Sequence, residues 1–103
     1  MTPLDELRRA LHGGAHRFAD TLAFIAAHYD YRPSTFHNGA LYNAAGQNEG
    51  SCRTLALAQL EGLSDAETLL AFGEHYRAVL ATPAGSDHGN IRALLRGGLA
   101  WIA

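Results

Sequence analysis

Residues 64–81 read SDAETLLAFGEHYRAVLA, and this stretch predicts a helix that organises the fold. Ser64 and Glu67 have the spacing of a capping box, in which the serine oxygen accepts from the third helical N–H and the glutamate reaches back. Apolar side chains then recur at helical spacing, at Leu69, Phe72, Tyr76 and Val79. Gly73 within the pattern costs up to ~1 kcal/mol relative to alanine, which indicates that another backbone packs closely against it.

The same period predicts four further helices around this one. They run from Pro3, capped by Thr2, to Gly13, from about Arg17 to Tyr29, from about Ser51 to Glu61, and from a cap at Ser86 or Asp87 to about Arg96. After them, we expect Leu99, Trp101 and Ile102 to fold back onto the core.

One segment has a different pattern. Residues 35–42 read TFHNGALY, and Asn38-Gly39 is a typical two-residue hairpin turn because both positions accept positive φ. The flanking strands are short, so the ribbon needs helices to pack against. We therefore predict a mainly α fold, with about five short helices in a single compact domain and a small β-hairpin insertion. The alternative is a small α+β fold.

Length and composition limit the function classes. The chain has 103 residues, which is one domain spanning residues 1–103, and 48% of them are hydrophobic. A formal charge of -2 argues against a nucleic-acid partner, and the absence of a ~20-residue apolar run argues against a membrane span. A single cysteine excludes an internal disulfide and a multi-cysteine zinc site, and we predict neither a metal nor a cofactor.

Cys52 is the candidate nucleophile. If Ser51 caps its helix, Cys52 lies in the first turn, where the positive end of the helix dipole favours a thiolate. His37 or His88 would then act as base, oriented by Asp87 or Asn90, although a helix cap also explains Asp87-His88-Gly89-Asn90. The competing hypothesis is a buried thiol that packs in the core, and it is the one that we favour, because the neighbours Leu55 and Ala56 are apolar.

The candidate binding surface is the stretch of residues 43–51 with the adjoining hairpin tip, residues 37–39. This stretch has no apolar period, and it concentrates amide, hydroxyl and carboxylate side chains between two glycines. A purely structural role, in which Asn and Ser satisfy their own backbone, remains open. The predicted binding residues are Asn38, Asn43, Gln47, Asn48, Glu49 and Ser51.

Four segments together resemble the HopJ type III effector family. They are FHNG at 36–39, NAAGQNEGSC at 43–52, TLLAFGEHYR at 68–77 and DHGNIR at 87–92. The resemblance implies a single HopJ-like domain, made in the cytoplasm of a plant-associated bacterium and delivered into the host cell. It implies a host protein as partner and no known reaction, catalytic residue or cofactor. The alternatives are a small cysteine-dependent enzyme and a cytoplasmic bacterial protein that is not exported; the oligomeric state stays open.

Overall fold

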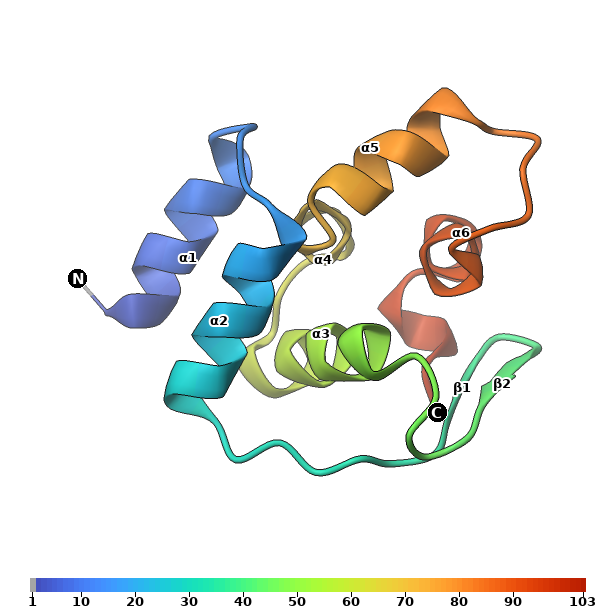
Figure 1. Cartoon of the computed structure of the whole chain (residues 1–103), viewed down its shortest axis with the longest axis horizontal. Helices are drawn as coiled ribbons and strands as arrows, with labels where there is room; N and C mark the ends of the chain where they lie inside the picture. Colours follow the sequence, from blue (N-terminus) through green and yellow to red (C-terminus); the bar gives the residue numbers. More distant parts are fainter. Residues whose placement is uncertain (1) are drawn as a thin grey trace.

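The computed structural model describes residues 2–103, and in that range helices make up most of the fold, with one two-stranded hairpin at its edge (Figure 1). The predicted mainly α fold with a small β insertion is confirmed. The elements are α1 (Pro3–His12), α2 (Phe18–His28), β1 (Phe36–Asn38), β2 (Leu41–Asn43), α3 (Glu49–Glu61), α4 (Asp65–Ala71), α5 (Glu74–Ala81), α6 (Gly89–Gly97) and a 3-10 turn η1 (Leu99–Trp101). None of these helices is both long and apolar enough to cross a bilayer.

The predicted capping box at the start of α4 is present. The Glu67 N–H donates to Ser64 Oγ at 3.0 Å, and the Ser64 N–H donates to Glu67 Oε1 at 3.0 Å. The other carboxylate oxygen of Glu67 lies 3.5 Å from Arg8 Nε and 3.4 Å from His12 Nε2, so the cap also fastens α1 to α4. The Ser64 N–H and these partners lower the pKa of Glu67 below its ordinary value.

Replacing Ser64 by alanine should lower the free energy of unfolding by about 1 kcal/mol, because the first turn of α4 loses its side-chain acceptor. Chemical denaturation measures this change. Ser86→Ala is the matched control, since the Ser86 side chain is exposed and caps no helix in the described chain, and its midpoint should not move. An unchanged midpoint for Ser64→Ala would contradict the role of the cap.

The predicted single helix of residues 64–81 is wrong in one respect, because it breaks into α4 and α5 at Phe72-Gly73. Gly73 has φ 57° and ψ -126°, a conformation that glycine tolerates and other residues avoid. A Cβ there would lie 2.5 Å from the Phe18 nitrogen and 2.8 Å from the Arg17 carbonyl carbon. The close backbone approach predicted from this glycine is therefore confirmed, and the chain turns to make room for it.

Two helix starts also differ from the prediction. α3 begins at Glu49 with Asn48 as its N-cap, not at Ser51, and α6 has His88 as its N-cap, not Ser86 or Asp87. Both caps adopt left-handed backbone conformations, and neither side chain caps its helix. The Asp87 carboxylate instead accepts a 2.6 Å hydrogen bond from the side chain of Arg92, which lies about one turn further along the chain.

The hairpin turn lies one residue later than predicted. Asn38 pairs with Leu41, so the turn residues are Gly39-Ala40. The Asn38 side chain is buried in the core. The C-terminal residues extend the ribbon on its other side: His37 and Ala103 exchange two backbone hydrogen bonds, of 2.9 and 3.0 Å. The Trp101 ring covers Gly39 and Gly97 but stays 44% exposed, whereas Leu99 and Ile102 pack against the core as predicted.

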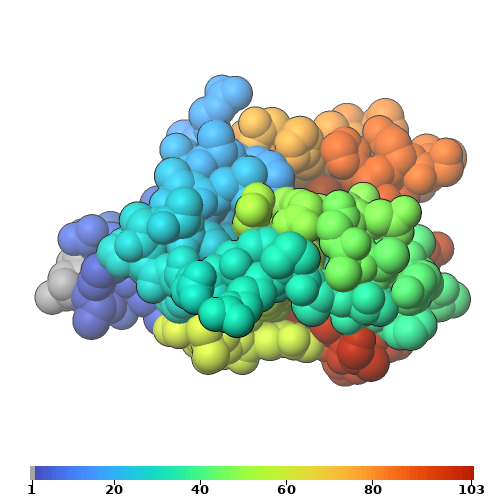
Figure 2. All heavy atoms as spheres, turned by 60° about the horizontal axis from the view of Figure 1, so that its bottom comes forward, coloured from blue at the N-terminus to red at the C-terminus, as the bar shows by residue number. Residues whose placement is uncertain are grey.

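Two apolar clusters form the core. One surrounds Phe72 and joins α3, α4, α5 and α6 to β1; the other surrounds Leu11 and joins α1, α2, α3 and α4. Tyr31 and Leu99 pack against both clusters. Figure 2 shows the blue-green linker between α2 and β1, which carries Tyr31, crossing one face of the molecule as an extended segment.

Candidate functional site

Cys52 lies in the core, as predicted. Its side chain is 5% exposed, and its sulfur is 3.7 Å from the hydroxyl and 3.8 Å from the carbonyl oxygen of Ser34. Its N–H donates to the Asn48 carbonyl, because α3 begins before Ser51. Cys52 is therefore already within the hydrogen-bonded part of α3, and its own N–H is not free to stabilise a thiolate.

The residues proposed to activate Cys52 lie elsewhere. His37 is exposed on β1, where its ring contacts Tyr42 with 5.2 Å between centroids. His88 lies at the start of α6, with Nε2 3.8 Å from an oxygen of Asp87. No hydrogen bond or ion pair within residues 2–103 joins Cys52 to any of these three side chains. The structure therefore does not assemble a cysteine–histidine pair.

The Cys52 thiol should react with a thiol reagent at least about a hundredfold more slowly in the native protein than in denaturant, because labelling requires local opening. A colorimetric thiol assay measures both rates. The control is Leu60→Cys in a Cys52→Ala background, since Leu60 is exposed on the same helix and should label at the denatured rate. Equal rates for native and denatured wild-type protein would contradict the buried thiol.

Three buried asparagines connect the hairpin to α6. Asn43 Oδ1 accepts from the Asn90 amide at 2.9 Å, and Asn90 Oδ1 accepts from the amides of Asn43 and Asn38, each at 3.2 Å. The Asn38 amide also donates to the Asn90 carbonyl at 2.9 Å. Asn38 and Asn43 are fully buried, so these two predicted binding residues present no surface, and their amides fix the hairpin to the helix.

The other four predicted binding residues lie on or beside the surface loop. Asn48 is exposed, and its amide donates to Asn43 Oδ1 at 2.6 Å, which ties the loop to the buried network. Gln47 Oε1 accepts from the Ala44 N–H at 3.1 Å, and Glu49 lies 3.8 Å from Arg53. Ser51 faces a cavity.

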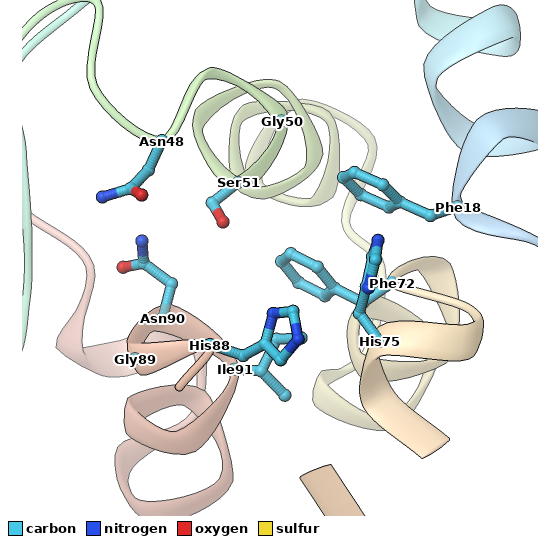
Figure 3. A pocket seen from close by; sticks show the side chains of 10 residues that line it. All are labelled: Phe18, Asn48, Gly50, Ser51, Phe72, His75, His88, Gly89, Asn90 and Ile91. Atoms are coloured by element: carbon cyan, nitrogen blue, oxygen red, sulfur yellow. The ribbon is translucent and has the colours of Figure 1, made fainter. Parts of the chain in front are cut away.

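This cavity has a volume of about 310 Å³ and lies between the starts of α2, α3, α5 and α6 (Figure 3). One wall is aromatic, with the Phe18 and Phe72 rings stacked at 5.7 Å between centroids. A second wall is the imidazole pair of His75 and His88, with 4.9 Å between centroids. Ile91 adds to the apolar lining, and the polar edge is formed by Asn48, Gly50, Ser51, Gly89 and Asn90.

No sequence pattern predicted this cavity. Its histidine wall depends on the break at Gly73, which places His75 in the first turn of α5 rather than in the middle of a long helix. Asn48 and His88, the two non-glycine residues with positive φ among the described residues, both line it. Such conformations persist where the surrounding structure enforces them, and they gather at binding sites.

The fold and the cavity together define a small, mainly helical domain with a mixed aromatic and polar pocket at the starts of four helices. The chain belongs to the HopJ type III effector protein family, which matches residues 4–103. It is also similar to a solved structure described as the crystal structure of an unknown function protein, VPA0580, from a Vibrio. The two are 37% identical with a TM-score of 0.91, over 100% of this chain and 88% of that one. No curated protein matches the chain.

Proposed function

We propose that this protein is a type III effector that enters a host cell and acts there by binding a host protein. Family membership supports the effector class. The observation that supports binding is the loop of residues 44–48, which is exposed in the middle and anchored at both ends by the buried Asn43 and the Asn48 amide. A loop held in this way presents side chains at a low entropic cost of binding.

The proposed contact surface extends from this loop onto the hairpin. Gln47 and Glu49 offer an amide and a carboxylate, and neither is needed by the buried network. Beside them, Tyr42 is 54% exposed, and its ring packs on His37. An exposed tyrosine beside adaptable polar groups is the composition that protein-binding surfaces favour.

The burial of Cys52 is the reason to prefer binding over cysteine catalysis. A nucleophile needs access to substrate and a base within hydrogen-bond reach, and Cys52 has Ser34 as its polar neighbour. The Cys52→Ala variant should therefore keep full effector activity in any host assay. Loss of activity in a variant with unchanged thermal stability would restore the enzyme hypothesis.

Delivery is tested with a reporter that is active only in host cytoplasm, such as a calmodulin-dependent adenylate cyclase fused to the C-terminus of the chain. We expect cyclic AMP in host cells infected with a secretion-competent strain and none with a strain that lacks the secretion ATPase. Because the solved relative comes from a Vibrio, animal cells and plant cells are both tested. Equal signals from the two strains, or no signal in either cell type, would favour a protein that stays in the bacterial cytoplasm.

Partner binding is tested with Gln47→Ala and Glu49→Ala. Both variants should keep the melting temperature of the wild type and weaken a host phenotype or a purified complex. Gln59→Ala is the matched control, because Gln59 is also an exposed amide and lies far along α3 from the loop. Full activity of both loop variants would show that the loop is not part of the binding surface.

A further inference from the structure

We infer that the cavity between α2, α3, α5 and α6 binds a small molecule that has an apolar ring and one oxyanion group, either a carboxylate or a phosphate. This inference concerns a small-molecule ligand and does not depend on the proposed binding of a host protein. It is carried by the cavity, by its distribution of hydrogen-bond donors and by the imidazole pair on its wall (Figure 3).

The size and the aromatic wall limit the apolar part of the ligand. A cavity of about 310 Å³ is at the lower end of the range for ligand sites, so it fits roughly one ring with a short substituent. The stacked rings of Phe18 and Phe72, with Ile91 beside them, provide an apolar wall. His75 packs edge-on against Phe18 at 5.2 Å between centroids, which holds its imidazole at the boundary between the apolar and polar parts.

The polar part of the lining carries backbone donors, and none of the ten lining residues has a carboxylate. The Asn48 and Asn90 amides each donate to Asn43 Oδ1, and Ser51 adds a hydroxyl (Figure 3). In the described part of the chain, no acceptor bonds the backbone N–H groups of Gly50, Ser51, Gly89 or Asn90. A ligand group with several acceptor oxygens and a negative charge complements such a lining.

The imidazole pair makes this complementarity dependent on pH. The charged groups near it are paired: Glu74 with Arg17 at 3.6 Å, Asp87 with Arg92 at 2.6 Å, and Glu49 with Arg53 at 3.8 Å. Asp87 also lies 3.8 Å from His88. Because each carboxylate already has an arginine partner, protonation of His75 or His88 adds positive charge to the cavity, and an oxyanion benefits from that charge.

The test is a titration of the full chain followed by amide chemical shifts in NMR spectra, with benzoate and phenyl phosphate as probes. Benzamide is the neutral analogue of benzoate, and inorganic phosphate lacks the ring. We expect benzoate or phenyl phosphate to bind in the millimolar range or tighter and to shift the amides of Gly50, Ser51, Gly89 and Asn90. The tighter of the two probes identifies the oxyanion. Benzamide and inorganic phosphate should bind at least about tenfold more weakly.

The pH dependence is measured with benzoate, which stays ionised from pH 5.5 to 8. Its affinity should fall about tenfold over this range, because neutral imidazoles no longer add positive charge to the cavity. The double variant His75→Gln with His88→Asn should lose both the affinity at pH 5.5 and the dependence on pH. Asparagine suits position 88 because it tolerates the left-handed conformation there. His28→Gln is the control, since His28 is exposed at the end of α2 and does not line the cavity, and it should leave benzoate binding unchanged.

Three results would overturn the inference. They are the absence of shifts with benzoate and phenyl phosphate up to millimolar concentrations, equal affinity for benzoate and benzamide, and wild-type binding by the double variant. Circular dichroism of that variant confirms that it is folded. If the double variant does not fold, the same benzoate titration is done with the single variant His75→Gln. This variant should lose about half of the pH dependence, because one of the two imidazoles remains.

Discussion

The Gly73→Ala variant should lose at least about 3 kcal/mol of unfolding free energy, the largest loss that we expect from a single methyl group in this chain. Two costs add together. Alanine must adopt φ 57° with ψ -126°, outside the left-handed helical region, and its Cβ must enter space occupied by the backbone of Arg17 and Phe18. Backbone atoms cannot rotate away as a flexible side chain can, so α2 and α5 must separate. A domain of this size has roughly 5–15 kcal/mol of stability, so the variant loses a large part of it.

Gly62→Ala is the matched control for this prediction. Gly62 also has positive φ, 67°, but its ψ of 37° places it in the left-handed helical region, and a Cβ there meets nothing within 4 Å. Its cost should stay near 1 kcal/mol, the conformational penalty alone. Urea denaturation of both variants separates the steric cost from the conformational one. Equal losses for Gly62→Ala and Gly73→Ala would show that the contact with α2 carries no energy.

Removing the centre of the asparagine network should have the second largest effect. Asn43→Ala leaves the amides of Asn90 and Asn48 without their acceptor and takes one donor away from Asn90 Oδ1. Unsatisfied buried polar groups cost about 1–3 kcal/mol each, so we expect a loss of about 2–4 kcal/mol. The hairpin and the start of α6 should also exchange their amide protons faster, since this network joins them.

Gln47→Ala provides the comparison, because it deletes an exposed amide four residues away that has one bond to the loop backbone. Its effect on thermal or chemical denaturation should stay below about 0.5 kcal/mol. A loss for Asn43→Ala as small as that for Gln47→Ala would show that the network contributes little to stability.

Periodicity and capping predicted most of the fold. The spacing of apolar residues located the helical segments, although it merged α4 and α5 into one helix. The Ser64–Glu67 pair predicted the start of α4 because a capping box depends on contacts only three residues apart. The helix starts at Asn48 and His88 were missed because their left-handed caps are imposed by tertiary contacts. The Asn38 amide shifted the hairpin turn for the same reason, since its partner lies 52 residues away in the sequence.

The candidate site was less accessible to prediction than the fold. The loop of residues 44–48 could be identified because it lacks an apolar period, but the burial of Asn38 and Asn43 depends on a helix more than 40 residues later. The cavity is formed by the first turns of α2, α3, α5 and α6, and the turn of α5 exists only because the chain breaks at Gly73. A local pattern suggested a close approach at that glycine, yet it could not show which backbone approaches or where the chain would turn.

The pairing of His37 with Ala103 has a consequence for how the protein is made. Translation produces the hairpin before the backbone partners of His37 and Gly39, which are Ala103 and Trp101. A nascent chain that stops before Leu99 therefore has a ribbon with one side unpaired and no indole over Gly39. Isolated two-stranded ribbons of this length are not stable in water, so the hairpin becomes ordered only after synthesis of the C-terminal residues. The order of the hairpin therefore depends on residues 101–103, which lie far from it in the sequence.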